Sequence, residues 1–202
     1  MTDALKRRPA QRPAVITNLA ADVHAFTSNA YLVDGDRPVL VDPGANFDVV
    51  AALADHPDPE AVVLTHAHPD HVGNLDAVRE AFGVPAYGPG APAENRVADG
   101  DELALGDHDY RVLATPGHHP EHVCLYAPGP GVLFAGDLVF QNGGFGRTDL
   151  EGADHAALVE SIEYVLEACG DVRSLYAGHG PVVETQAREH VELALRAART
   201  SA

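Results

Sequence analysis

The chain has 202 residues, the size of one domain with a sizeable core. Its 30 acidic residues outnumber 13 basic ones, and the net charge of −17 argues against binding nucleic acid, whose phosphates need basic partners. Neither an apolar secretory leader nor a run of roughly 20 apolar residues, the length of a membrane span, is visible. We therefore expect one cytoplasmic domain over residues 1–202, with no membrane contact and with residues 1–12 as a flexible polar arm.

Lys6 is the only lysine, which favours a halophilic protein over an ordinary acidic enzyme. Self-repulsion at this charge destabilises a compact fold in dilute buffer. At 1 M salt, charges are screened within about 3 Å. We predict that the melting temperature rises steeply from dilute buffer to molar KCl, beyond the few hundred millimolar at which ordinary screening saturates. A melting curve that is flat across this range would count against the halophilic interpretation.

The N-terminal half of the chain begins with short apolar runs. Tyr31–Val33 and Val39–Val41 flank Asp34-Gly35-Asp36, a pattern typical of a β-hairpin. A helix is expected over residues 47–54, with Asn46 as its N-cap. A second helix is expected over residues 74–82, ending at Gly83.

The C-terminal half alternates apolar runs with glycine-rich turns. Residues 140–153 form a glycine-rich loop, and Asp154 caps the helix that follows it, which carries an apolar stripe. A last helix is expected over residues 185–199. Further strands are expected over residues 110–114, 123–126, 132–134 and 174–176.

Four metal-ligand residues follow the apolar run at residues 62–64. His66 and His68 lie two apart, so in an extended chain they project to the same side. Asp70 and His71 come next, at the start of an expected helix. Imidazole and carboxylate groups are ligands of zinc, iron and manganese. Two ligands followed at once by two more predict a pair of neighbouring metal sites, and the simpler alternative is a histidine-rich surface turn.

The same arrangement, an apolar run followed by small residues and then a ligand-type residue, occurs four times. It delivers His66, His118, Asp137 and His179. All four therefore lie beyond the C-terminal ends of expected strands. In sheets covered by helices, ligands converge at that edge, so we expect these side chains to meet there.

These motifs resemble the signature of the metallo-β-lactamase superfamily in their order along the chain. The resemblance implies an α/β fold, an αββα sandwich of two mixed sheets flanked by helices. It also implies two divalent metal ions at one edge, zinc or else iron or manganese. The quoted motifs are His66-x-His68-x-Asp70-His71, Thr115-Pro116-Gly117-His118, Gly136-Asp137 and Gly178-His179-Gly180.

The resemblance also implies a role for each ligand. Asp137 would bridge the two metals. Asp42 would steady the ligands, or else serve only as the turn former of Asp42-Pro43-Gly44. The first metal would be held by His66, His68 and His118, and the second by Asp70, His71 and His179.

Residues 146–150, Gly-Arg-Thr-Asp-Leu, resemble the glyoxalase II-type thioesterases, or hydroxyacylglutathione hydrolases, and the related persulfide dioxygenases. The thioesterase resemblance implies that a metal-bound hydroxide, oriented by Asp70, cleaves a thioester of a small 2-hydroxy acid. Arg147 would touch the substrate, or else only pair with Asp149. His122 stands where the dioxygenases favour cysteine, which favours hydrolysis, and we expect it to hydrogen-bond to a ligand.

Two alternatives stay open. An iron-dependent persulfide dioxygenase would use His66, His118 and Asp137, and a metal-binding protein without catalysis would need only the ligands. The sequence departs from the family pattern Thr-Pro-Gly-His-Thr-x-Gly-His at His119 and Glu121, which affects the pocket wall. No glutathione-binding helical domain is expected after the last helix, so several small thiols are expected as carriers.

Overall fold

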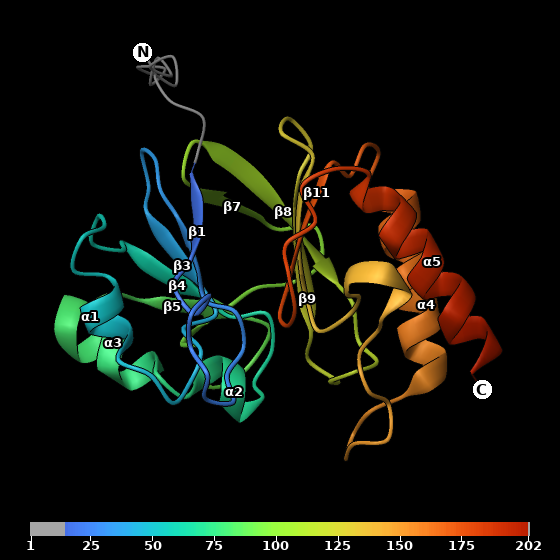
Figure 1. Cartoon of the computed structure of the whole chain (residues 1–202), viewed down its shortest axis with the longest axis horizontal. Coiled ribbons are helices and arrows are strands. Elements are labelled where there is room, and N and C mark those ends of the chain that lie inside the picture. The colour runs from blue at the N-terminus through green and yellow to red at the C-terminus, as the bar shows by residue number, and fades with distance from the viewer. Residues whose placement is uncertain (1–14, 202) are drawn as a thin grey trace, which may run out of the picture.

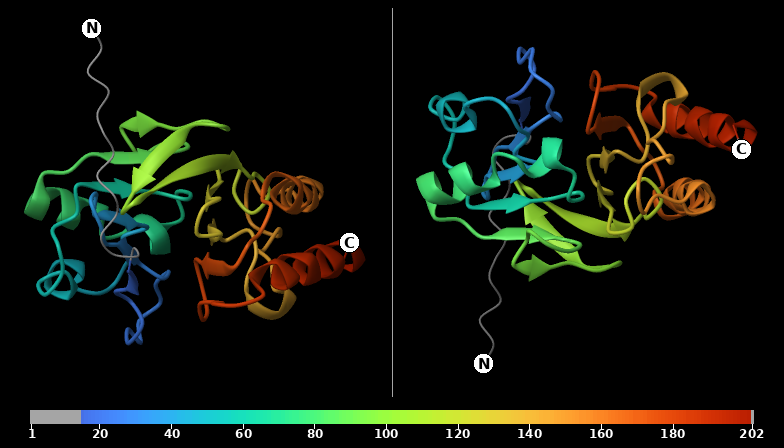
Figure 2. Two further views of the ribbon diagram at one scale, coloured as in Figure 1. Left: turned by 90° about the horizontal axis from the view of Figure 1, so that it is seen from above. Right: turned by 90° about the horizontal axis from the view of Figure 1, so that it is seen from below.

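Figure 1 shows a computed structural model of the chain, which describes residues 15–201. The predicted flexible arm, residues 1–12, lies outside the described residues. Two β-sheets face each other, and helices cover the outer face of each (Figures 1 and 2). This is the αββα sandwich that the motifs predicted.

The first sheet has six strands and is mixed. β1, β2 and β3 pair antiparallel, and the strands from β3 to β6 pair parallel. The predicted hairpin is confirmed, because Tyr31 pairs with Val41 and Val33 with Val39. In sheet order the strands are β1 (Ile16–Asn18), β2 (Tyr31–Val33), β3 (Val39–Val41), β4 (Ala61–Val63), β5 (Ala86–Gly88) and β6 (Asn95–Arg96).

The second sheet has five strands and is also mixed. Its only parallel pair among the described residues is β10 with β11; the other neighbours are antiparallel. In sheet order the strands are β11 (Ser174–Ala177), β10 (Val132–Gly136), β9 (Val123–Ala127), β8 (His108–Ala114) and β7 (Glu102–Leu105).

Alternation of side chains along the strands builds three apolar layers. In the hairpin, Tyr31 and Val33 face the layer between the sheets, whereas Leu32 packs under the helices of the first sheet. In β8, Val112 likewise faces inward and Leu113 faces the helices of the second sheet. The helices are α1 (Val49–Ala52), α2 (Pro69–Val72), α3 (Leu75–Phe82), α4 (His155–Ala168) and α5 (Ala187–Thr200), with a short 3-10 turn η1 (Gln141–Gly143).

Helix boundaries agree with the sequence in part. Asp154 caps α4 as predicted, because its side chain accepts a hydrogen bond from the Ala157 amide, and Gly83 ends α3 in the left-handed conformation. The prediction that Asn46 caps the first helix was wrong. Asp48 caps α1 instead, and the Asn46 side chain donates to the carbonyl of Phe26.

The five helices within residues 15–201 are all too short or too polar to cross a bilayer.

Candidate metal centre

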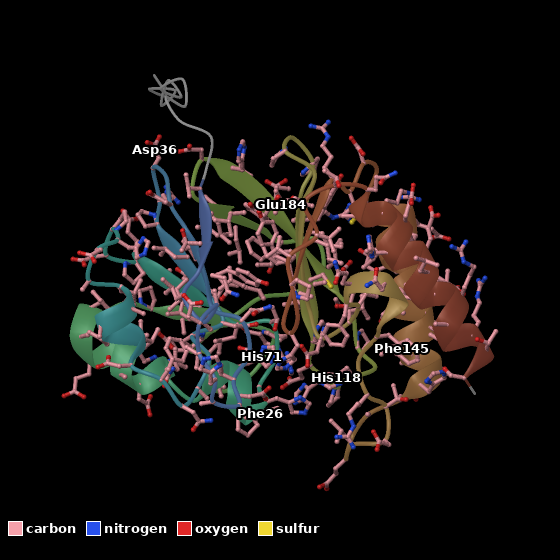
Figure 3. All side chains as sticks on the ribbon, in the orientation of Figure 1. Phe26, Asp36, His71, His118, Phe145 and Glu184 are labelled. Carbon is pink, nitrogen blue, oxygen red and sulfur yellow. The ribbon has the colours of Figure 1, made fainter. Side chains whose placement is uncertain are left out.

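The predicted ligands gather at one end of the sandwich. Figure 3 shows His71 and His118 there, at the opposite end from Asp36 and Glu184. The four ligand-bearing loops follow β4, β8, β10 and β11, so the expected convergence at strand ends is observed.

Three imidazoles from two loops form the first cluster. Nδ1 of His68 lies 3.1 Å from Nε2 of His66 and 2.9 Å from Nε2 of His118. One ring nitrogen from each residue therefore faces the same point, and these atoms lie within 4.8 Å of one another. Three nitrogens at this spacing match the three-histidine set of a catalytic zinc site.

The second cluster joins residues from opposite sheets. Asp70 and His71 belong to α2, and His179 follows β11. Oδ2 of Asp70 lies 3.0 Å from Nε2 of His179 and 4.0 Å from Nε2 of His71. Two imidazoles and a carboxylate form a second set of three ligand-type atoms.

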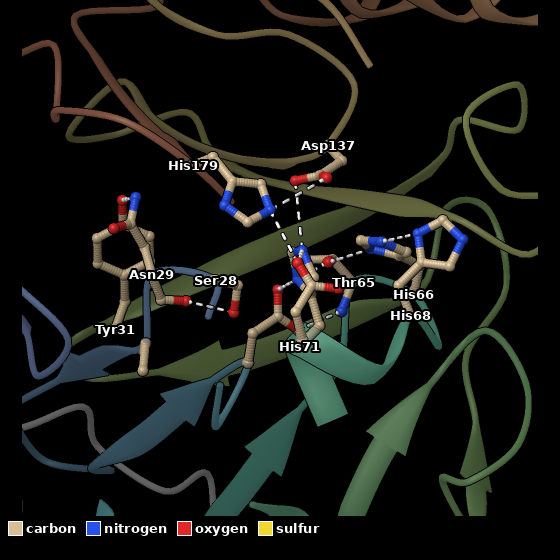
Figure 4. Close-up of polar contacts among 12 residues, drawn as sticks. Ser28, Asn29, Tyr31, Thr65, His66, His68, His71, Asp137 and His179 are labelled. Atoms are coloured by element: carbon tan, nitrogen blue, oxygen red, sulfur yellow. Dashed lines mark hydrogen bonds and ion pairs between the residues drawn. The ribbon is translucent and has the colours of Figure 1, made fainter. Parts of the chain in front are cut away.

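Asp137 lies between the two clusters (Figure 4). Its Oδ1 faces Nε2 of His71 at 3.3 Å, while its Oδ2 lies 3.5 Å from Nε2 of both His118 and His179. One carboxylate therefore reaches both clusters, which is the arrangement that a bridging ligand requires.

Two ligand atoms in this cluster lack the partners that buried polar atoms normally have. Within residues 15–201, Nε2 of His71, Oδ1 of Asp137 and Oη of Tyr110 are the buried side-chain atoms without a hydrogen bond. The first two face each other without hydrogen-bond geometry. Since an unpaired buried polar atom is costly, this pair fits a bound cation. The histidine and aspartate cluster is therefore suited to a dinuclear metal site.

Asp42 fixes the orientation of His71. Its Oδ2 lies 2.8 Å from Nδ1 of His71 and accepts a hydrogen bond from Oγ1 of Thr65 at 2.7 Å. A hydrogen on Nδ1 leaves the lone pair of Nε2 facing the site, as metal-binding histidines commonly require. Two roles were predicted for Asp42, and the structure shows the contact with a ligand-type residue, His71. Thr65, which also lies 3.0 Å from Nδ1 of His66, was missed by the sequence analysis.

His118 is oriented by a backbone group. Its Nδ1 donates to the carbonyl oxygen of Arg147 at 2.8 Å, so Nε2 is left for a metal. The Arg147 side chain is exposed and makes two hydrogen bonds to Asp149, at 2.9 and 2.8 Å. Two roles were predicted for Arg147, and the structure shows the pairing with Asp149.

His122 supports the backbone of Asp137, the residue between the two clusters. It is buried, its Nε2 accepts the backbone N–H of Asp137 at 3.1 Å, and its Nδ1 lies 2.8 Å from Oγ1 of Thr115. Burial lowers the pKa of His122 to about 3, so the ring is neutral and can accept this bond. The structure therefore contains a hydrogen bond between His122 and the backbone of Asp137, one of the predicted ligands.

The electrostatics of the centre favour ionised carboxylates. Burial alone would raise the pKa of Asp137, but His71, with help from His179 and His118, holds it at about 2. Burial alone would lower the pKa of His71, but Asp42 and Asp137 raise it to about 10. A cation between these groups would take the place of the proton that His71 otherwise carries.

Two residues that the predicted ligand set does not include, Phe26 and His119, lie beside its histidines. Phe26 is 76% exposed and stacks on His179, with ring centroids 6.1 Å apart. His119 lies 5.1 Å from His68 between ring centroids, but it belongs to neither cluster. Glu121 pairs with exposed Arg96 at 2.9 Å, so the loop after β8 is tied to the first sheet. The sequence around Phe26 contains no motif that points to the site. Only the three-dimensional structure, in which its ring stacks on His179, places it there.

A cavity of about 490 Å³ adjoins His179. It lies between residues 18–29 and residues 179–182, and apart from the imidazole its lining side chains carry no formal charge. In a chain with 30 acidic residues, this cavity is lined by no carboxylate side chain.

Comparisons with known proteins agree with the fold. A model of the metallo-β-lactamase superfamily matches residues 24–95 and 86–187. The probable metallo-hydrolase YqgX of Bacillus subtilis is 33% identical over 186 residues, covering 79% of this chain and 88% of that protein. The hydroxyacylglutathione hydrolase of Klebsiella pneumoniae is 39% identical over 134 residues, covering 62% of this chain and 52% of that protein, about half its length.

Two similar crystal structures cover nearly all of the chain. ETHE1 from Myxococcus xanthus superposes with a TM-score of 0.74 at 25% identity, over 94% of this chain and 91% of that one. TTHA1623 in a di-iron-bound form superposes with a TM-score of 0.69 at 31% identity, over 92% of this chain and 97% of that one.

Proposed function

Because the chain belongs to the metallo-β-lactamase superfamily, we propose that it is a metal-dependent thioesterase that hydrolyses thioesters of small 2-hydroxy acids. The observation that carries this proposal is the position of Asp137 between two clusters of three ligand-type atoms each. Similarity to hydroxyacylglutathione hydrolases supports the reaction type.

We propose that the first cluster, His66, His68 and His118, holds one divalent metal and that Asp70, His71 and His179 hold the other. Zinc suits these ligands, and iron or manganese would also fit. When bound, such ions acidify a water molecule and polarise a carbonyl group.

The protein's own groups would then control geometry and proton position. His179 helps to hold the pKa of Asp70 low against the effect of burial, so its carboxylate is ionised and can accept a hydrogen bond from the attacking water. The Arg147 carbonyl and Asp42 keep His118 and His71 in the tautomers that face the site. The neutral His122 holds the backbone of Asp137 without adding charge.

The uncharged cavity beside His179 offers room for one arm of a small thioester. Its lining contains no cationic side chain other than the imidazole, so nothing in it selects the two carboxylates of glutathione. We therefore propose that several small thiols serve as carriers. The acidic surface suits work in the cytoplasm of a cell that maintains concentrated salt.

The reaction can be tested with oxygen as the variable. We expect purified protein, loaded with zinc or iron, to release free thiol from a lactoyl thioester at the same rate with and without O₂, because hydrolysis consumes only water. Thiol release is followed with a thiol-reactive dye in an anaerobic chamber and in air, with glutathione and N-acetylcysteamine as carriers.

The principal competitor uses part of the same centre. A persulfide dioxygenase would need one iron on His66, His118 and Asp137, and of these residues Oδ2 of Asp137 lies 3.5 Å from Nε2 of His118. If the iron-loaded protein instead consumes O₂ in proportion to added glutathione persulfide and leaves lactoyl thioesters intact, the dioxygenase replaces the thioesterase. If it tightly binds metal and processes neither substrate, a non-catalytic metal-binding role replaces both.

A further inference from the structure

The second ligand cluster joins segments that belong to different sheets, as the first does, and its histidine from the second sheet lies in a glycine-flanked loop. Asp70 stands on α2, below the first sheet, whereas His179 lies in a loop of the second sheet, between Gly178 and Gly180. The side chain of His179 is 34% exposed, more than its partners in the cluster. Something must hold this glycine-flanked loop at the correct distance from α2.

Ser28 and Asn29 lie between these two segments (Figure 4). The backbone N–H of Ser28 donates to the carbonyl of Asp70 at 3.1 Å. The next N–H, that of Asn29, donates to the carbonyl of Gly178 at 2.7 Å. Consecutive amides therefore bind the residue that carries one ligand and the residue directly before the other.

The side chain of Asn29 extends this contact around His179. Its Nδ2 donates to the carbonyl of Ala177 at 2.8 Å and lies 2.9 Å from the carbonyl of Gly180. Its Oδ1 accepts a hydrogen bond from Nδ2 of Asn18 at 2.9 Å, which sets the orientation of the amide. Asn29 thus contacts backbone carbonyls on both sides of His179.

Tyr31 adds a neighbouring link. Its buried hydroxyl donates to the carbonyl of Ala177 at 2.8 Å and lies 2.8 Å from Nδ2 of Asn29. The hydrogen bonds found for Ser28 and Asn29 in the described chain reach the second cluster and do not reach His66, His68 or His118.

We propose that Ser28 and Asn29 form a positioning element for the second metal site, and that Asn29 is its principal side chain. This inference rests on the proposed two-metal function. By holding the His179 loop against α2, the element fixes the separation of Asp70 and His179 before a metal binds. Groups that orient ligands in this way typically change metal affinity by about 10- to 100-fold when they are removed.

The test measures metal affinity on the full chain and needs no substrate. Asn29→Ala and Asn29→Asp are compared with Asn95→Ala, a matched control whose amide donates to the carbonyl of Ala86 at the far edge of the first sheet. We expect the two Asn29 variants to bind the second Zn²⁺ about 10- to 100-fold more weakly than wild type in a metal-buffered titration. The first Zn²⁺ should bind with unchanged affinity, and Asn95→Ala should match wild type.

A cobalt titration separates positioning from a general structural role. The absorption bands of Co²⁺ should develop normally for the first equivalent and change for the second in the Asn29 variants alone. Unchanged affinity for both ions, or an equal loss of both, would overturn the proposal. If the Asn29 variants do not fold, Tyr31→Phe is used instead, because it removes one hydrogen bond to Ala177 and keeps the ring in the core. It should lower the affinity for the second ion alone. Affinity equal to wild type would contradict the proposal. A wrong choice of substrate would leave all these outcomes unaffected.

Discussion

Replacing Asp137 by alanine is expected to release both metals and to lower thioester turnover by more than about 10³-fold, beyond the 10²–10³ lost when one electrostatic group is deleted from an active site. The reason is geometric. Its Oδ1 faces His71 of the second cluster, and its Oδ2 lies 3.5 Å from both His118 of the first cluster and His179 of the second. Removing the carboxylate also leaves a dense group of imidazoles without the negative charge that balances the ions.

Comparing the metal content of two variants tests whether Asp137 bridges the two metals. His118→Ala should empty the first site and abolish turnover while one metal stays bound in the second cluster, whereas Asp137→Ala should lose both metals. His108→Ala is the matched control. His108 begins β8, whereas His118 lies in the loop that follows the other end of this strand. Metal content by mass spectrometry after gel filtration and turnover of a lactoyl thioester are the measurements. If one ion alone binds firmly in wild type, and the Asp70→Ala and His179→Ala variants keep full activity, the two-metal interpretation fails.

The positions of His66, His118, Asp137 and His179 in the fold could be predicted because each follows a strand with a clear apolar pattern. The runs before His66, His118, Asp137 and His179 became β4, β8, β10 and β11, and parallel or facing strands bring such ends together. The hairpin and the cap of α4 were predictable for the same reason, since their signals are local.

What the sequence could not decide depends on contacts between distant segments. Asp42 could be a turn former or a partner of a ligand, and the decision comes from the parallel pairing of β3 with β4, which brings it to Thr65 and His71. Arg147 orients His118 through its backbone carbonyl. Because every residue has this group, the residue type at position 147 could not predict the contact. Asn46 had the side chain of a cap, but its backbone adopts φ 61° and its amide bonds to the Phe26 carbonyl instead.

Gly178→Ala is expected to disrupt the centre although it replaces none of the ligand-type residues. A Cβ at Gly178 would overlap Oδ1 of Asp137 and lie 2.7 Å from Cε1 of His71. Both side chains are buried, and the amide of Gly178 donates to the carbonyl of Gly136 at 2.7 Å, so neither side can yield easily. The loop that carries His179 must therefore move away from the bridge.

We expect Gly178→Ala to lose about 10²-fold or more in turnover, the cost of a displacement near 1 Å at a reacting centre. Overpacking should also lower the free energy of unfolding by about 1–3 kcal/mol. Gly170→Ala is the matched control, because nothing lies within 4 Å of a Cβ there. Its free energy of unfolding should stay within about 0.5 kcal/mol of wild type. Denaturant unfolding, zinc stoichiometry and thiol release measure the three effects. If Gly178→Ala binds two metals and turns over at the wild-type rate, then close packing of the His179 loop against Asp137 is not what sets the geometry of this centre.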